Sequence, residues 1–201
     1  MIRIQLISCL LLLSSLFFTS CLTQKETAQK KEIFKVVQTA KKELPQILEK
    51  IPAGYEQSYG FESKDEFINS KVGKPFRFFT IKNNQLTDTS PYTLPITVDN
   101  QFRALATVEY INDTLHIVDF GSNVLAKEIQ TVCNENKQLR FTGILRVYEI
   151  YSDFLMVNSK GQNQFIPLSS AKLFLKNNIN KPIQRYYNET QIINFLKTVK
   201  P

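Results

Sequence analysis

The side chains best suited to acid–base chemistry are His116, the one histidine of the chain, and Glu109, seven residues before it. The dipeptide Asn112-Asp113 separates two strand-like stretches and favours a two-residue hairpin turn. Such a turn places Glu109 directly opposite His116, where the carboxylate could fix the tautomer of the imidazole ring for catalysis. Polar cross-strand pairs are also common on exposed sheet faces, so a purely structural pair is the alternative.

Cys133 is the second candidate for chemistry, as a nucleophilic thiol alone or in a dyad with His116 if the fold brings the two together. The chain has three cysteines, and Cys9 and Cys21 both lie in its N-terminal leader. Once the leader is cut and Cys21 is modified as described below, Cys133 has no cysteine partner for an intrachain disulfide. A buried, unreactive thiol is the structural alternative for this residue.

The composition excludes several kinds of site. A single histidine rules out the HExxH motif, zinc fingers and other metal sites built on two or more imidazoles. The six glycines are scattered singly, so no glycine-rich loop is available to hold a phosphate. Asp119-Phe120-Gly121 spells a kinase tripeptide, but the accompanying kinase motifs are missing. We therefore expect no metal ion, no cofactor and no complete catalytic set.

The first 21 residues have the pattern of an export signal. Arg3 supplies a positive start, residues 4–18 contain no charged side chain, and small residues follow before Cys21. The apolar run is shorter than the roughly 20 residues that span a bilayer as a helix. Phe18-Thr19-Ser20-Cys21 resembles the lipobox of bacterial lipoproteins, whereas Leu6-Ile7-Ser8-Cys9 has almost no hydrophobic segment before it.

The resemblance implies that a signal peptide, residues 1–20, is removed and that Cys21 carries a diacylglycerol and often a further acyl chain such as palmitate. Two or more acyl chains hold a protein firmly on a membrane. Leu22 stands where an aspartate retains many lipoproteins in the inner membrane. The expected location is therefore the cell envelope, at the outer membrane, on its periplasmic face or at the cell surface. Cleavage without acylation, which leaves a free Cys21, is the alternative.

The remaining chain has the composition of a globular domain, because 43% of the residues are hydrophobic and 11% are aromatic. The net charge of +7 is spread thinly. The most lysine-rich part, residues 25–42, is interrupted by glutamates and is typical of a solvated helix face, which could also lie near anionic lipid head groups. A nucleic-acid site needs a clustered basic patch with aromatic residues between the charges, so no nucleic-acid partner is expected.

Hydrophobic periodicity indicates a long helix followed by strands and short helices. Apolar residues recur at helical spacing from Ile33 to Ile51, and Pro45 is expected to kink or divide this helix. Residues 82–91 have the composition of a loop. The hairpin turn at 112–113 also predicts that Thr107 lies opposite Val118. Short helices are expected to begin near Ser63, Ser122, Ser169 and Asn188, and strands at 76–81, 93–98, 102–111, 115–120, 139–150, 154–157 and 164–167.

These elements predict an α+β fold in which the N-terminal helix packs on an antiparallel meander sheet, with further short helices. A helix followed by a meander resembles the cystatin-like helix-on-sheet folds, in architecture only and without a diagnostic motif. We expect a lipid-anchored tether at residues 21–30 and a single domain at 31–201, with any subdivision near 134–138.

Three kinds of function fit these sequence features. The first is a non-enzymatic envelope lipoprotein that contacts the membrane through acylated Cys21 and binds a ligand or protein partner, or supports an assembly. The second is an envelope enzyme of the hydrolase type that uses Glu109 and His116, or Cys133. The third is a protease inhibitor or immunity protein, which an exposed apolar loop or edge strand would favour.

Asp113-Thr114-Leu115 resembles the short O-glycosylation motif of Bacteroidota envelope proteins. The resemblance implies that Thr114 carries a sugar, and this requires Thr114 to be exposed at the tip of the hairpin. An unmodified turn is the alternative.

Overall fold

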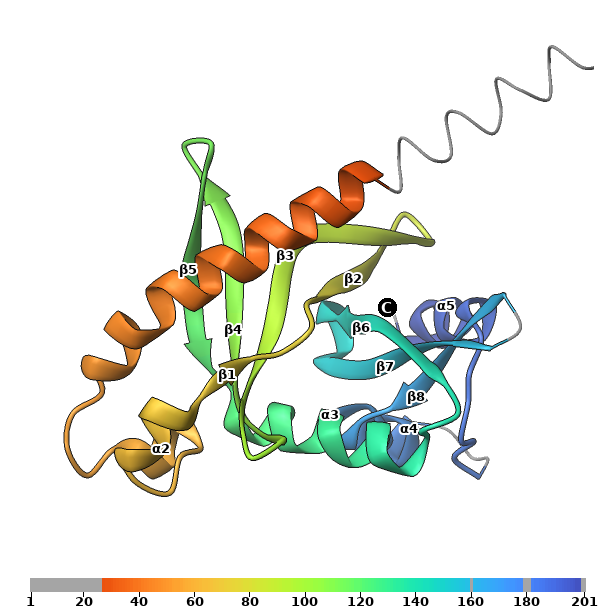
Figure 1. Ribbon diagram of the computed structural model, residues 1–201. Coiled ribbons are helices and arrows are strands. Elements are labelled where there is room, and N and C mark those ends of the chain that lie inside the picture. Colours follow the sequence, from red (N-terminus) through yellow and green to blue (C-terminus); the bar gives the residue numbers. More distant parts are fainter. Residues whose placement is uncertain (1–26, 160, 179–181, 200–201) are drawn as a thin grey trace, which may run out of the picture.

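The computed structural model describes residues 27–159, 161–178 and 182–199 (Figure 1). The expected signal peptide at 1–20, Cys21 and the first part of the expected tether lie outside the described residues. From residue 27 onward the chain has the expected α+β class, with an N-terminal helix packed on a mostly antiparallel sheet and several shorter helices.

The N-terminal helix occupies residues 27–49 of the described chain and runs across one face of the sheet (Figure 1). Val36, Ala40, Leu44 and Leu48 recur every four residues, and all four are buried, so one stripe of the helix faces the sheet. The helix continues through Pro45, so the expectation that the proline divides it was wrong. Burial of the apolar stripe on both sides of the proline offsets the one backbone hydrogen bond that proline cannot make.

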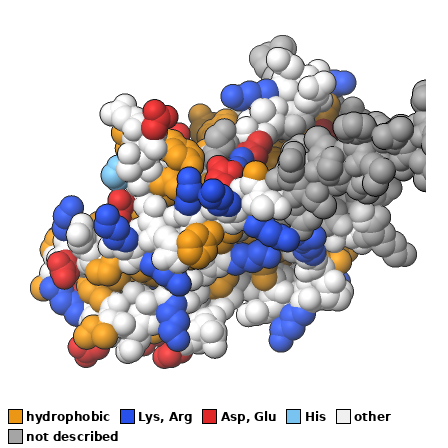
Figure 2. Space-filling view, turned by 45° about the horizontal axis from the view of Figure 1, so that its top comes forward, with side chains coloured by type: hydrophobic (Ala, Val, Ile, Leu, Met, Phe, Trp, Pro, Cys, Tyr) orange, Lys and Arg blue, Asp and Glu red, His pale blue; other side chains and the backbone are white. Residues whose placement is uncertain are grey.

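The opposite side of this helix faces solvent. Figure 2 shows lysine and arginine side chains over this part of the surface, with acidic side chains among them. The described lysines at 30, 31, 35, 41 and 42 have Glu32 and Glu43 beside them in the sequence. The helix therefore presents a mixed charged surface to water, as its sequence predicts.

Eight strands form one sheet with the order β5-β4-β3-β2-β6-β7-β8, and β1 pairs with β3 beside this path. All neighbouring strands are antiparallel except β2 and β6, which are parallel. The strands are β1 (Lys71–Val72), β2 (Phe76–Lys82), β3 (Gln85–Val98), β4 (Gln101–Ile111), β5 (Thr114–Gly121), β6 (Arg140–Val147), β7 (Ser152–Ser159) and β8 (Gln162–Pro167). The helices after the first are η1 (Glu56–Tyr59), α2 (Asp65–Asn69), α3 (Asn123–Glu135), η2 (Tyr148–Ile150), α4 (Ser169–Asn178) and α5 (Glu189–Val199).

Helices cover both faces of the sheet. Ala104 and Ala106 of β4 pack with the N-terminal helix, whereas Leu105, between them, packs against α3 on the reverse face. In the second half of the sheet, Ile144 faces α3 and Leu145 faces α4 and α5. One helix, α3, therefore contacts apolar residues from both halves of the sheet.

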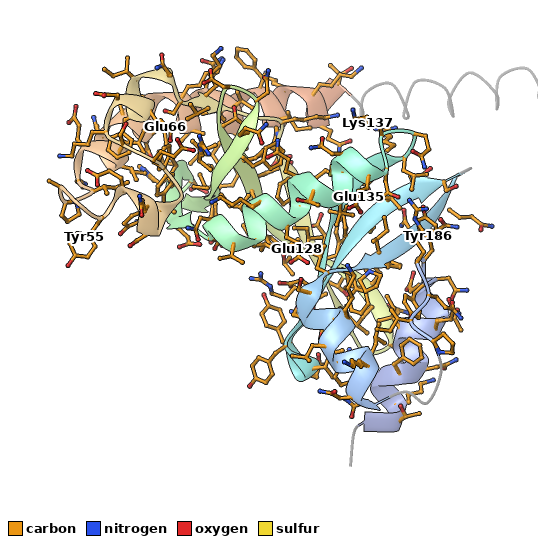
Figure 3. The ribbon with its side chains drawn as sticks, turned by 90° about the horizontal axis from the view of Figure 1, so that it is seen from below. Tyr55, Glu66, Glu128, Glu135, Lys137 and Tyr186 are labelled. Atoms are coloured by element: carbon orange, nitrogen blue, oxygen red, sulfur yellow. The ribbon has the colours of Figure 1, made fainter. Side chains whose placement is uncertain are left out.

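Helix α3 also holds the start of α4. The Glu128 carboxylate accepts hydrogen bonds from the backbone N–H and, at 2.6 Å, from the hydroxyl of Ser169, the first residue of α4. Figure 3, seen from below, shows Glu128 and Glu135 on α3 and the helices of the C-terminal half beside it. A carboxylate at a helix N-terminus satisfies free amide hydrogens and complements the helix dipole.

Two details of the sheet differ from expectation. Thr107 lies opposite Asp119 instead of Val118, because a β-bulge between Thr107 and Val108 adds one residue to the register. Residues 82–91 are not a loop: after a turn at Asn83 and Asn84, most of this segment belongs to β3, which pairs with β2.

Candidate functional site

The structure places Glu109 opposite His116 in the β4–β5 hairpin, as the sequence predicts. The turn residues Asn112 and Asp113 both have positive φ angles, 48° and 63°, which a two-residue turn of this type requires. Glu109 is exposed, however, and the hydrogen-bond partner of the imidazole is a different residue.

That partner is Glu43 of the N-terminal helix. Nδ1 of His116 lies 2.9 Å from Oε1 of Glu43, and Oε2 of the same carboxylate accepts the backbone N–H of Ile117 at 2.8 Å. An ionised carboxylate only accepts hydrogen bonds, so Nδ1 carries the proton and Nε2 is the basic nitrogen of the neutral ring. Glu43 therefore holds the tautomer, the role that the sequence suggested for Glu109.

The pair borders a cavity of about 420 Å³ between the N-terminal helix and the β4–β5 hairpin. Phe34, Tyr110 and Thr114 also line this cavity. The His116 side chain is 44% exposed, so its imidazole can reach a molecule in the cavity. Chemically the arrangement can exchange a proton with a bound ligand.

Cys133 lies far from this pair. It is on α3, packed against the cluster that contains Ile129 and Ile144, whereas His116 lies in the β4–β5 hairpin (Figure 1). Burial raises the pKa of the Cys133 thiol, which disfavours the nucleophilic thiolate. The structure thus separates Cys133 from His116 and gives Cys133 the surroundings of a structural thiol.

Thr114 is exposed beside the hairpin turn, which meets the steric condition for a modified hydroxyl. The turn between β6 and β7 exposes aromatic side chains, with Tyr148 58% and Tyr151 91% exposed. This turn is the kind of exposed apolar loop that the inhibitor hypothesis requires.

A second polar cluster surrounds Arg77 of β2. Its guanidinium binds the Asp88 carboxylate at 2.6 Å, lies 3.7 Å from Glu32 and stacks 4.2 Å above the Tyr92 ring. Burial raises the pKa of the Tyr92 phenol, which stays neutral at ordinary pH. Glu32 belongs to the N-terminal helix, whereas Asp88 and Tyr92 belong to β3. The cluster around Arg77 therefore connects the N-terminal helix to the sheet.

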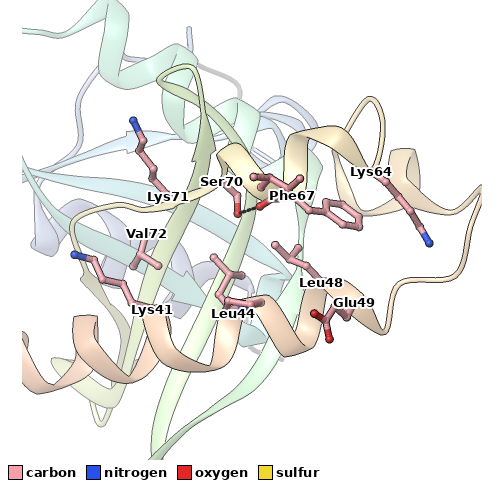
Figure 4. A pocket seen from close by; sticks show the side chains of 11 residues that line it. Lys41, Leu44, Leu48, Glu49, Lys64, Phe67, Ser70, Lys71 and Val72 are labelled. Carbon is pink, nitrogen blue, oxygen red and sulfur yellow. Dashed lines mark hydrogen bonds between the residues drawn. The ribbon is translucent and has the colours of Figure 1, made fainter.

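A groove lies between the N-terminal helix and the segment formed by α2 and β1 (Figure 4). Its volume is about 770 Å³. Leu44 and Leu48 line it from the helix, and Phe67 and Val72 line it from the other side. The apolar lining and the size are typical of sites for small organic ligands.

Lysines dominate the rim of this groove. Lys41, Lys64 and Lys71 line it together with one acidic residue, Glu49. Ile68, on the α2 side, is 89% exposed and extends the apolar surface outward. The sequence does not predict this groove, because its two walls are separated in the chain and neither wall carries a motif.

Among the described residues, no three His, Cys, Asp or Glu side chains gather as the ligands of a metal ion would. No helix in the described ranges combines the length and the apolar character needed to cross a bilayer.

The geometry thus offers one polar pair, His116 with Glu43, and one large apolar groove with a cationic rim. Comparisons of the chain with protein-family models, with curated proteins and with solved structures found no match.

Proposed function

We propose that this protein is a lipid-anchored binding module of the bacterial cell envelope, with the groove between the N-terminal helix and α2–β1 as its ligand site. The observation that carries the proposal is the groove, whose apolar floor and charged rim suit a ligand with an apolar part. The lipobox-like segment that ends at Cys21 supports the anchoring.

The position of the domain in the chain agrees with this function. Residues 21–26 separate the lipidated cysteine from the described helix, and six residues reach at most about 20 Å when fully extended. A domain on so short a tether stays near the membrane surface. Its groove then meets molecules of the envelope, including lipids and their products.

Metabolic labelling tests the anchor. The full chain, expressed in a bacterial host with a radioactive fatty acid, is expected to incorporate label and to fractionate with membranes. Cys21→Ala should abolish both, because the thiol is the attachment point. Cys133→Ala is the matched control and should leave both unchanged. An unlabelled wild-type chain in the soluble fraction would contradict the anchoring.

Methyl NMR tests the binding. When an extract of envelope lipids and small molecules is added to the labelled protein, the methyl signals of Leu44, Leu48 and Val72 are expected to shift, since these side chains line the groove. Val124, which is 76% exposed on α3, is the matched control and should not shift. Unchanged groove signals, or equal shifts at Val124, would count against a binding role for the groove.

A further inference from the structure

The outward side of the N-terminal helix carries unpaired positive charge. Four of its exposed lysines have no carboxylate within ion-pair distance in the described part of the chain: Lys31, Lys35, Lys41 and Lys42. At 3.6 residues per turn, the four positions fall within about 120° of one another around the helix. They therefore form one basic stripe along this side, and Figure 2 shows basic side chains gathered over it.

The two glutamates that stand beside these lysines in the sequence are held at the sheet. The Glu32 carboxylate lies 3.7 Å from the guanidinium of Arg77 in β2. The Glu43 carboxylate binds β5, at the imidazole of His116 and the backbone N–H of Ile117. Both acidic groups are therefore on the sheet side of the helix, and a flat surface brought to the outward side meets the lysines first.

An exposed aromatic side chain stands among the lysines. Phe34 is 63% exposed, and it lies three residues after Lys31 and directly before Lys35. Tyr110 of the β4–β5 hairpin is 49% exposed, and both rings line the cavity between the helix and this hairpin. Asp113 lines the same cavity and offsets one of the four lysine charges. Exposed aromatic rings among lysines are typical of protein surfaces that touch the head-group layer of a membrane.

We propose that the outward side of the N-terminal helix docks on the anionic phospholipid surface of the membrane, with its lysines among the phosphate groups and the Phe34 ring inserted between them. The helix itself stays outside the bilayer, because its apolar stripe is buried against the sheet. This inference goes beyond the groove, and it uses the proposed anchor only to bring the membrane close. Each lysine near an anionic bilayer strengthens the binding by about fivefold.

The place of this surface in the chain favours a membrane over an acidic protein partner. Phe34 lies seven residues after the start of the described helix, which is about 10 Å along its axis. Residues 21–26 add at most about 20 Å between Cys21 and the helix. A bilayer that holds the acylated end of the chain is thus always within reach, whereas a protein partner has to be recruited from solution.

Vesicle sedimentation tests the attraction to anionic lipid. The mature chain carrying Cys21→Ala, which keeps all described residues and has no acyl chain, is mixed with vesicles of phosphatidylcholine alone or of phosphatidylcholine and phosphatidylglycerol in equal parts. We expect binding at least tenfold tighter to the anionic vesicles, and a loss of this preference at high salt, because salt screens the charges. No binding to the anionic vesicles, or equal binding to both kinds, would overturn the proposal.

Lysine variants test which surface makes the contact. Lys31→Gln/Lys35→Gln should weaken binding to the anionic vesicles at least tenfold, because it removes two charges beside Phe34. Lys172→Gln/Lys176→Gln is the matched control and should change the binding less than twofold. These two exposed lysines have the same spacing on α4, which lies away from the N-terminal helix (Figure 1, Figure 3). Equal losses would mean that net charge binds the vesicles, and the assigned surface would be wrong.

A tryptophan probe tests the insertion of Phe34. The chain contains no tryptophan, so Phe34→Trp introduces a single indole. With anionic vesicles its emission should shift to shorter wavelength, and lipids brominated on their acyl chains should quench it. Tyr151→Trp, at a position that is 91% exposed in the β6–β7 turn, is the matched control and should show neither effect. Equal quenching at both sites, or none at position 34, would overturn the insertion.

Further outcomes separate this proposal from its alternatives and from the proposed function. If poly-L-glutamate binds through Lys31 and Lys35 and anionic vesicles do not bind, the surface serves an acidic protein and the membrane proposal is wrong. If the vesicles bind but the wild-type chain takes up no fatty-acid label, the docking surface stands and the anchor fails. If the label is incorporated but the vesicles do not bind, the anchor stands and the docking surface is wrong.

Discussion

At the scale of single residues, Glu43 connects the N-terminal helix to the edge of the sheet. β5 is the outer strand, so its outward-facing amide hydrogens have no neighbouring strand to bind them. Glu43 accepts one of them, from Ile117, and also binds His116. One carboxylate thus satisfies an edge amide and fixes the imidazole.

We expect Glu43→Ala to lower the free energy of unfolding by about 1–3 kcal/mol, because it leaves the Ile117 amide and His116 without their partner. Glu109→Ala is the matched control. Glu109 is exposed on the strand opposite His116 and should cost less than about 0.5 kcal/mol. Urea unfolding of the two variants measures the difference. Equal losses would mean that the contact with Glu43 contributes little.

The partner of His116 could not be read from the sequence. The hairpin turn at Asn112 and Asp113 is a local signal, and it correctly predicted that Glu109 lies opposite His116. Glu43 precedes His116 by 73 residues, and only the packing of the helix across the sheet brings them together. Local turn chemistry fixes strand register, whereas contacts between distant elements depend on the whole fold.

At the scale of elements, the sequence predicted where the helices begin but did not predict the β-bulge or the strand around Asp88. Helices near Ser122, Ser169 and Asn188 were expected, and the structure has α3, α4 and α5 there. Only Asn188 accepts the capping hydrogen bond that the sequence suggests, from the backbone N–H of Gln191, whereas Ser122 makes no side-chain cap and the start of α4 is bound by Glu128. The bulge at Thr107 leaves no mark in the hydrophobic alternation. The polar segment around Asp88 resembles a loop, yet it forms a strand because β2 pairs with it.

The parallel pairing of β2 with β6 is the element-level feature that joins the two halves of the sheet. Gly143 makes the close approach possible. A Cβ atom at this position would lie 2.6 Å from the carbonyl oxygen of Arg77 and 2.7 Å from the Phe79 ring. The pairing of β2 with β6 therefore requires a residue without a side chain at position 143.

At the scale of the whole molecule, the start of the described chain and the groove lie towards opposite ends of one helix. The described helix starts at residue 27, and Lys41 at the near end of the groove is about 21 Å further along at 1.5 Å per residue. Under the proposed function, the helix acts as a spacer that separates the lipidated end of the chain from the ligand site.

A single domain was expected at 31–201, with any subdivision near 134–138. Strands from before and after these residues belong to one sheet, and α3 packs against both halves. We therefore expect Gly143→Ala to destabilise both halves together, by about 1–3 kcal/mol, because the added methyl crowds the joint between β2 and β6. Hydrogen exchange at Leu94 in β3 and Phe165 in β8 measures the two halves separately. Both amides should lose the same amount of protection.

Gly161→Ala is the matched control, since a Cβ atom there meets nothing within 4 Å and only its positive φ of 82° opposes the change. Its cost should be about 1 kcal/mol, without crowding of the joint. If Gly143→Ala opened β6–β8 while Leu94 in β3 kept its protection, the halves would unfold independently. The chain would then divide near 134–138, and α3 would be a cover for one half instead of a bridge between two.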